Sequence, residues 1–447
     1  MAKELYIMEH DPYYQRSCFD ISKYPVEFWD VNETISELSY LTHGYFRYYG
    51  KFPSKIGKLI VDDIYSKGAI DPAHDFVLDN YAGSGTTLVE AKLQGFDSYG
   101  IDINPFAVLA CRVKTRNYNV QKLNDYWEKL REEIISSNQS FYPENAQISF
   151  LIDEDSNSIE AINQEIERFK SDHNDAEKWF SEDAIKGLAI IKTLLLSRQH
   201  DSVREFFDLA FFSIVRRVSF AYDGEVRPHI NKKKRARNVA EAYIKKVDEM
   251  IAAMTDWNNA TSSSVQTNAF ICNNADAQNV TTFLQDIRNE TGKQLGLVVS
   301  HPPYLNCFDY IPVYKLKFMW GDGFHEVFGK YPFSDIKKME LKAHPADSYN
   351  NVANYFDHNR KVYQAIFDNL KSGGYCCIVI GDCTIREKLF EVHKTFISIL
   401  EEIGFVTEKI SYRSTMYGTG QYAYRHRADY SEDVDRKKDG VLFFRKP

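Results

Sequence analysis

The chain has 447 residues, of which 44% are hydrophobic and 26% charged, as in an ordinary globular protein large enough for two to three domains. Its 55 basic and 63 acidic residues give a net charge of −8, which argues against nonspecific coating of nucleic acid but leaves room for a local basic groove. A mean hydropathy of −0.43 and the lack of any run of eighteen apolar residues argue against a membrane span. The acidic start, MAKELYIMEHDPYY, differs from a signal peptide, so we expect a cytoplasmic protein.

Cysteine and aromatic residues bear on the chemistry that the chain can support. The seven cysteines are scattered and form no CxxC pair, so we expect reduced thiols, with neither a disulfide framework nor a structural zinc site. Aromatic residues make up 14% of the chain, and such rings either fill a core or stack on bases.

A regular alternation of strands and helices begins near residue 76. We expect a strand at Phe76–Asp79, a helix at Thr86–Gln94, a second strand at Ser98–Asp102 and a second helix at Pro105–Lys114. This order of elements predicts a parallel sheet with crossover helices, and hence an α/β fold.

The remaining strands are expected much later in the chain. Counting apolar runs gives about seven strands in all, the later ones at Asn268–Cys272, Leu295–Ser300, Tyr375–Gly381, Phe405–Ser411 and Val441–Arg445. Between them the pattern is helical, with expected helices at Trp127–Ile135, Ala184–Leu196, Val203–Val218 and Val239–Met254, besides one upstream at Ile56–Tyr65. We therefore divide the chain into an N-terminal segment (1–75), a first core part (76–120), a helical insertion (121–266) and a second core part (267–447).

The first chemical motif is the glycine-rich turn DNYAGSGTT, which begins at Asp79 and lies between a strand and a helix. Glycines let the backbone approach a ligand closely, and the free N–H groups of a helix start bind anions. Asp102 ends the following strand, a position from which a carboxylate reaches ribose hydroxyls in doubly wound folds. The turn has neither the P-loop nor the dinucleotide pattern, so a nucleoside ligand without pyrophosphate is favoured over an ordinary structural turn.

The second motif, SHPPYLNCFDY, directly follows the expected strand at Leu295–Ser300. Two consecutive prolines keep the chain extended and leave carbonyl groups outside any strand ladder, which creates a rigid acceptor site. Tyr304 then offers a flat ring at the carboxyl end of the sheet, where open α/β folds bind ligands. A proline-rich strand exit with a buried tyrosine is the alternative interpretation.

Together the two motifs resemble the S-adenosylmethionine-dependent methyltransferases that modify exocyclic amino groups of DNA bases. DNYAGSGTT is similar to that family's DPFxGSGTT motif, and HPPY to its catalytic tetrapeptide of Asp, Asn or Ser followed by Pro-Pro and an aromatic residue. YFRYYGKFPSKIGKLIV, LKSGGYCCIVIGD and GVLFFRK are also similar to segments of the family. The resemblance implies a Rossmann-like class I methyltransferase sheet with a target-recognition region inserted between the two motifs.

The resemblance also implies roles for individual residues. Asp102 would hold the ribose of S-adenosylmethionine, and Asp276 would lie near its adenine, although a solvated loop is the alternative for Asp276. The implied cofactor-binding residues are Lys51, Phe52, Asp79, Tyr81, Ala82, Gly83, Ser84, Gly85, Thr86, Thr87, Asp102, Ile103, Asp276 and Ser300. The implied catalytic residues are His301, Pro302, Pro303 and Tyr304, and no metal is required.

His301 departs from the family pattern, which has Asp, Asn or Ser before the prolines. An aromatic amine is a poor nucleophile, so acceptors such as the Pro302 carbonyl and the preceding side chain would bond its hydrogens and aim its lone pair at the methyl group. The base would be flipped out of the duplex and stacked on Tyr304. If His301 is the acceptor, activity should fall at acid pH, because a protonated imidazole only donates.

A basic run, NKKKRARN, is the clearest candidate for contacts with DNA phosphates in this acidic chain. A solvated loop is the alternative interpretation of this run and of a second basic cluster near residue 426. The candidate nucleic-acid-binding residues are Arg227, Lys232, Lys233, Lys234, Arg235, Arg237, Arg425 and Arg427.

The sequence thus predicts a DNA amino-methyltransferase, with cytosine favoured over adenine because SHPPYLN is similar to the TSPPYLN form. Its expected partners are double-stranded DNA and a cognate restriction or defence protein, and neither a membrane nor a metal. Two alternatives stay open, namely an RNA base methyltransferase, and a cofactor-binding recognition protein in which His301 marks a lost activity.

Overall fold

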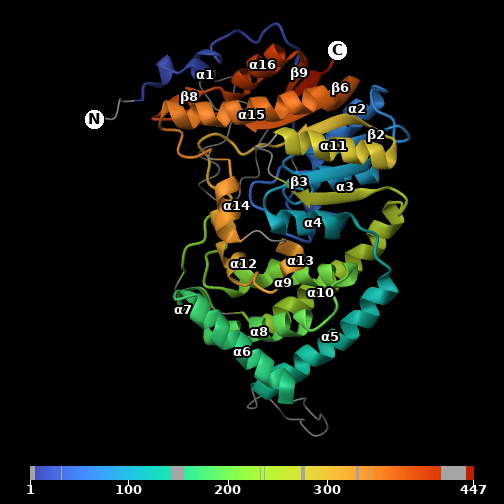
Figure 1. Ribbon diagram of the computed structural model, residues 1–447, viewed down its shortest axis with the longest axis vertical. Helices are drawn as coiled ribbons and strands as arrows, with labels where there is room; N and C mark the ends of the chain where they lie inside the picture. Colours follow the sequence, from blue (N-terminus) through green and yellow to red (C-terminus); the bar gives the residue numbers. More distant parts are fainter. Residues whose placement is uncertain are drawn as a thin grey trace.

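The computed structural model describes residues 6–31, 33–141, 156–231, 233–235, 237–272, 277–328, 332–341, 343–413 and 439–447. Figure 1 shows a large sheet flanked by helices at one end of the molecule and a separate layer of helices at the other. Within the described residues, no helix is both long enough and apolar enough to cross a membrane.

Eight strands form the main sheet, in the order β1-β9-β10-β6-β5-β2-β3-β4. Strand β10 is antiparallel to both β6 and β9, while the other pairs of neighbours are parallel. A small hairpin of β7 and β8 stands apart from it. The strands are β1 (Val26–Trp29), β2 (Asp75–Asp79), β3 (Asp97–Asp102), β4 (Thr267–Ile271), β5 (Gln294–Ser300), β6 (Leu370–Gly381), β7 (Cys383–Ile385), β8 (Lys388–Phe390), β9 (Val406–Arg413) and β10 (Asp439–Arg445).

This sheet confirms the predicted α/β doubly wound fold. All seven predicted strands are present within a few residues of their expected bounds; β2, β5 and most of β6 are buried runs, whereas β4 at the other edge of the sheet is mostly half-buried. An eighth strand, β1, lies at the edge beside β9, and its four residues are only half-buried or exposed. Because β1 carries no buried apolar run, its sequence gave no strand signal.

Helices cover both faces of the sheet and form the second layer. The helices are α1 (Pro12–Gln15), α2 (Ser54–Ser66), α3 (Thr86–Leu93), α4 (Pro105–Thr115), α5 (Val120–Phe141), α6 (Ser156–Asp172), α7 (Ala176–Trp179), α8 (Glu182–Leu196), α9 (Ser202–Val218), α10 (Val239–Ala260), α11 (Ala277–Thr291), α12 (Lys315–Met319), α13 (His325–Phe328), α14 (Phe333–Met339), α15 (Tyr349–Asn369) and α16 (Val392–Ile403). In Figure 1, α11, α15 and α16 lie with the sheet, whereas α5, α6, α8, α9 and α10 form the separate layer.

The strand order creates a switch point between β2 and β5. From β2 the chain moves outward through β3 to β4, and then returns to place β5 on the other side of β2, followed by β6. The carboxyl ends of β2 and β5 are therefore adjacent, with helices leaving in opposite directions, and such crevices bind ligands in open α/β sheets. Both chemical motifs predicted from the sequence begin at these two strand ends.

Helix α4 joins the sheet to the helical layer through one continuous hydrophobic cluster. Phe106, on its first turn, is completely buried and packs against Phe212 of α9, with ring centroids 4.9 Å apart. The same ring contacts Phe318 of α12 at 4.8 Å and Phe328 of α13 at 5.0 Å. The helical layer is thus fixed against the element that follows the cofactor motif.

Replacing Phe106 with Ala should destabilise the protein by about 3–5 kcal/mol, because it removes a ring shared by four helices and leaves a cavity. Urea unfolding followed by circular dichroism measures this loss. Phe28→Ala on β1 is the matched control, since this ring is 62% exposed and its removal should cost less than about 1 kcal/mol. Equal losses in the two variants would contradict the packing argument.

Candidate active site

The turn between β2 and α3 depends on two glycines with positive φ. Gly83 has φ +49° and Gly85, which caps α3, has φ +74°. A Cβ atom at Gly85 would lie 2.9 Å from the sulfur of Cys111 on α4, so any side chain there would displace the helix. The backbone of the turn therefore lies directly on α4, with the start of α3 facing outward.

Asp102, at the end of β3, is tied to this turn through its side chain. One carboxylate oxygen accepts a hydrogen bond from the Gly83 N–H at 2.8 Å, and the other accepts one from the Asn104 N–H at 2.8 Å. Burial raises the pKa of Asp102 to about 6, although these backbone donors favour the ionised form. The carboxylate is thus held in one orientation and still lines the adjacent cavity.

Asp79 supports the turn from behind. Its side chain is buried and accepts a hydrogen bond from the Tyr81 N–H at 3.1 Å. Burial raises the pKa of Asp79 to about 7. Asp79, Gly85 and Thr87 do not line the cavity, so their contribution is to the shape of the turn and not to direct contact with a ligand there.

A buried lysine, which the sequence motifs did not indicate, holds the same turn. Lys114 of α4 is fully buried, and its ammonium group donates to the Ser84 carbonyl. Burial, with a contribution from the charge of Lys51, lowers the pKa of Lys114 to about 7. The only sequence signal was a lysine in an otherwise apolar helix, which is more often solvent-exposed through its long side chain.

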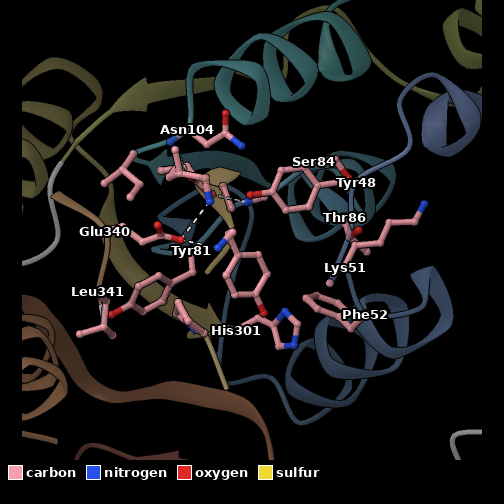
Figure 2. A pocket seen from close by; sticks show the side chains of 18 of the residues that line it. Tyr48, Lys51, Phe52, Tyr81, Ser84, Thr86, Asn104, His301, Glu340 and Leu341 are labelled. Carbon is pink, nitrogen blue, oxygen red and sulfur yellow. Dashed lines mark hydrogen bonds between the residues drawn. The ribbon is translucent and has the colours of Figure 1, made fainter. Parts of the chain in front are cut away.

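The two motifs border one cavity of about 810 Å³, part of it open to solvent (Figure 2). The residues that line it are Tyr48, Gly50, Lys51, Phe52, Tyr81, Ala82, Gly83, Ser84, Thr86, Asp102, Ile103, Asn104, His301, Pro303, Tyr310, Ile311, Met339, Glu340, Leu341 and His358. The structure therefore brings together eleven of the residues that the sequence assigned to the cofactor and to catalysis.

His301 projects toward the segment that precedes α2. Its ring lies edge-on to Phe52 with centroids 5.2 Å apart, and edge-on to Tyr304 at the same distance. Lys51 lies beside Phe52 and donates to the His43 carbonyl at 3.4 Å. The N-terminal segment and the catalytic motif thus meet at one wall of the cavity, as Figure 2 shows for Lys51, Phe52 and His301.

The two proline carbonyls have different surroundings. The Pro303 carbonyl accepts a hydrogen bond from the hydroxyl of Tyr355 on α15 at 2.8 Å. Among the residues that the structure describes, none donates to the Pro302 carbonyl. The Pro302 carbonyl thus stays without a donor from the described residues at the end of β5, although Pro302 itself does not line the cavity.

Ser300 and Tyr304 lie outside the cavity lining. The Ser300 hydroxyl is buried and bonds the Tyr363 hydroxyl at 2.8 Å, so it belongs to the core beneath α15. Tyr304 packs on Gly381 of β6, where a Cβ atom would lie 2.5 Å from the ring. Neither residue contacts the cavity as the sequence analysis expected for a cofactor ligand and a stacking ring.

A buried ion pair holds the hydroxyl group of Tyr304. Arg413 of β9 bonds both carboxylate oxygens of Asp439 of β10, at 2.9 and 2.8 Å. The Tyr304 hydroxyl donates to Asp439 at 3.0 Å and accepts from Arg413 at 3.3 Å. Two residues from neighbouring strands, Arg413 and Asp439, therefore fix the orientation of Tyr304.

The candidate nucleic-acid residues fall into three groups. Lys232, Arg425 and Arg427 lie outside the described residues, as does Asp276. The exposed side chains are those of Arg227, Lys233, Arg235 and Arg237. Lys234 is half-buried, and its ammonium donates to the carbonyls of Arg216 and Ala221 and to Asp223, at 3.2, 2.8 and 3.0 Å. All three of its N–H groups are thus used within its own loop.

Metal ligands are not gathered at this site or elsewhere in the part of the chain that the structure describes. No group of three or more His, Cys, Asp or Glu side chains there could hold a metal ion.

Comparison with known proteins agrees with these features. The sequence model of a DNA methylase family, that of the N6 and N4 methyltransferases, matches residues 8–112. The type II methyltransferase M.MvaI of Kocuria varians is 26% identical over 211 residues, which are 46% of this chain and 42% of the relative. M.MjaII of Methanocaldococcus jannaschii is 38% identical over 81 residues, covering 18% of this chain and 14% of the relative. The chain thus spans less than half the length of these curated relatives.

These matches confirm the resemblance to the amino-methyltransferases of DNA bases, which the family model detects over residues 8–112. Among solved structures, an rRNA methyltransferase, aviRa from Streptomyces viridochromogenes, covers 93% of this chain and 94% of its own at 10% identity, with a TM-score of 0.31. That score is too low to carry an argument about this chain.

Replacing Arg413 with Ala should destabilise the protein by about 3–5 kcal/mol, because the buried carboxylate of Asp439 would lose its partner. Tyr304→Phe removes only the hydroxyl and should cost about 1 kcal/mol. Guanidinium unfolding of both variants measures the difference, and similar values would show that Asp439 does not depend on the arginine.

Proposed function

We propose that this protein transfers a methyl group from S-adenosylmethionine to an exocyclic amino group of a flipped base in double-stranded DNA, preferentially the 4-amino group of cytosine. The observation that carries the proposal is the single cavity at the β2–β5 switch point, which is lined both by the glycine turn with Asp102 and by the His-Pro-Pro motif. The preference for cytosine rests on the similarity of SHPPYLN to the TSPPYLN form.

The residues of the cavity suit S-adenosylmethionine. Asp102 presents a fixed carboxylate for the ribose hydroxyls, and the backbone at Gly83 and Ser84 leaves room for a ligand to approach closely. The Ser84 hydroxyl is buried without a partner among the described residues, so a polar group of a ligand would satisfy it. Lys51 is suited to the carboxylate of the methionine part.

The catalytic motif would prepare the target amine for attack. When bound, S-adenosylmethionine supplies an electrophilic methyl group. The Pro302 carbonyl accepts one hydrogen of the amine and the neutral imidazole of His301 accepts the other, which shifts the nitrogen toward tetrahedral geometry and localises its lone pair. Rigid placement of both acceptors contributes through orientation, because the amine is held in a reactive position.

Transfer of a labelled methyl group to plasmid DNA and to total RNA, followed by mass spectrometry of the nucleosides, tests the proposal. We expect 4-methylcytosine from DNA, with activity falling at acid pH as His301 becomes protonated. At saturating S-adenosylmethionine, where weaker cofactor binding does not limit the rate, His301→Asn should retain an acceptor and lose this fall. A 6-methyladenine product would show that the target base is adenine. Label in RNA alone would show that the substrate is RNA and not DNA. Cofactor binding without transfer to either polymer would contradict a methyltransferase and favour a recognition protein.

Cofactor affinity should depend on the protonation of Asp102. Because the pKa of Asp102 is about 6, its carboxylate becomes protonated below that pH and then binds ribose hydroxyls less well. The affinity for S-adenosylhomocysteine should therefore be constant at high pH and weaken as the pH falls through 6. Calorimetric titration between pH 5 and pH 8 measures this change. Asp102→Asn should bind more weakly and lose the weakening near pH 6. If the affinity of Asp102→Asn changes with pH as it does in the wild-type protein, Asp102 does not contact the cofactor.

The DNA surface is proposed to include the exposed cations of the segment before α10, within the helical region 121–266 that we propose as the target-recognition region. Lys233, Arg235 and Arg237 are exposed there and suited to phosphate contacts. Lys234 is left out because its own loop occupies its ammonium group. The names of the type II relatives further support a restriction–modification role with a partner nuclease.

Replacing Lys233, Arg235 and Arg237 together with Ala should weaken DNA binding and reduce its salt slope by about 2.7, since each phosphate contact contributes about 0.9. Lys234→Gln is the matched control from the same run, and its slope should not change. Fluorescence anisotropy with a labelled duplex across a salt series measures both. If the triple variant shows the same salt dependence of DNA binding as the wild-type protein, this segment does not contact DNA.

A further inference from the structure

The cavity has two sides of different chemistry. Figure 2 shows Ser84, Thr86 and Lys51 on one side, and Glu340 and Leu341 on the other. Lys51 is the single lysine or arginine among the described lining residues, so the side of Glu340 has no cation to receive a phosphate or carboxylate. Leu341 lies on that side in Figure 2, and Met339 and Ile311 adjoin Glu340 in sequence or through its hydrogen bond, whereas the ring of Tyr310 reaches across to Gly50, which precedes Lys51.

Glu340 is fixed on this side by the chain that follows the catalytic motif. One carboxyl oxygen, Oε1, accepts hydrogen bonds from the N–H groups of Tyr310 and Ile311, the latter at 3.0 Å. These donors stand at the start of a 3₁₀ turn, Ile311–Tyr314, while Glu340 itself follows α14. The second oxygen, Oε2, has no hydrogen-bond partner among the described residues, so the carboxyl group is oriented but half of it remains available.

His358 of α15 lines the same cavity and has an unused nitrogen. Its Nε2 atom is buried and has no hydrogen-bond partner within the described part of the chain. Burial lowers the pKa of His358 to about 4, so the ring is neutral at physiological pH. Burial likewise raises the pKa of Glu340 to about 7, although two backbone donors favour its ionised form. The His358 ring can therefore bond a ligand without bringing a charge, and the Glu340 carboxyl group is protonated, and so able to donate, in about half of the molecules at pH 7.

These features define the ligand that fits. Apolar side chains beside Glu340 and the ring of Tyr310 accommodate a flat ring system, and a carboxyl group and an imidazole match the hydrogen-bonding edge of that ring. A nucleobase has this chemistry, whereas a phosphate or a charged amino acid would need a charged partner. The opposite side, with Asp102 and Lys51, carries the groups suited to the ribose and carboxylate of the cofactor.

We propose that Glu340 and His358 read the edge of the flipped target base, with Glu340 donating to the ring nitrogen next to the amino group and His358 bonding the neighbouring position through Nε2. The inference rests on the proposed function and deepens it, since it assigns the residues that select the base. In cytosine the two positions are N3 and O2, both acceptors, and two donors would therefore favour cytosine.

The experiment compares binding of two DNA duplexes in the presence of S-adenosylhomocysteine. The wild-type protein first methylates plasmid DNA, and sequencing locates the modified base. One duplex then carries a single intact site, and the second is identical except that the target nucleotide is abasic. Glu340→Ala should bind the intact duplex roughly ten- to hundredfold more weakly and the abasic duplex as tightly as wild type, because the lost contact is to the base alone.

Three further variants make the test specific. Glu340→Gln keeps an oxygen for the two backbone N–H groups and a donor for the base, so it should bind both duplexes like wild type. His358→Phe keeps a ring but loses the nitrogen, and should be weakened only on the intact duplex. Glu290→Ala, at an exposed position of α11, is the matched control and should change neither affinity. Calorimetric binding of S-adenosylhomocysteine should be equal in all four variants.

Equal weakening of Glu340→Ala on both duplexes would overturn the inference, since the residue would then support the fold and not the base. Unchanged binding of the intact duplex would overturn it as well. Both results leave the proposed methyltransferase standing, because the wild-type protein has modified DNA. A wild-type protein that methylates no DNA would overturn the proposed function, and the base-reading role with it.

Discussion

Parallel pairing of β2 with β5 is the constraint on which the site depends. It places the carboxyl ends of two strands side by side although more than 200 residues separate them in the chain. Because one of these ends carries the glycine turn and the other the His-Pro-Pro motif, the pairing creates a crevice with Gly83 and Ser84 on one side and His301 and Pro303 on the other. Neither motif alone would make a cavity.

Several buried polar groups keep this crevice in shape. Asp102 and Asp79 accept backbone N–H groups of the turn, Lys114 donates to a carbonyl of the same turn, and Glu340 holds the segment after the catalytic motif. Each bond is between a side chain and the backbone, so each fixes a stretch of chain that has no regular secondary structure. The site is therefore pre-organised by polar contacts that lie beneath its surface.

The sequence was most informative where a local pattern determined the structure. Short apolar runs and turn residues indicated the seven strands, and the predicted cofactor and catalytic residues include eleven that line the cavity. Strand β1 was missed because it is short and half-exposed, so its pairing with β9 depends on the tertiary fold. Glu340 and His358 were missed for a related reason, since nothing in their neighbouring residues indicates that two distant helices bring them to one cavity. Lys234 looked like its charged neighbours, and only the fold shows that its ammonium bonds to carbonyls.

The position of β10 has a consequence for how the protein is made. This strand lies between β6 and β9, yet it comes later in the chain than every other strand. During synthesis the edge of β6 must therefore remain unpaired until residues 439–445 leave the ribosome, and only then can β9, and β1 beside it, be joined to the rest of the sheet. Such late, long-range pairing is slow and leaves a strand edge open to other chains, so a chaperone that shields apolar edges would raise the yield of folded protein.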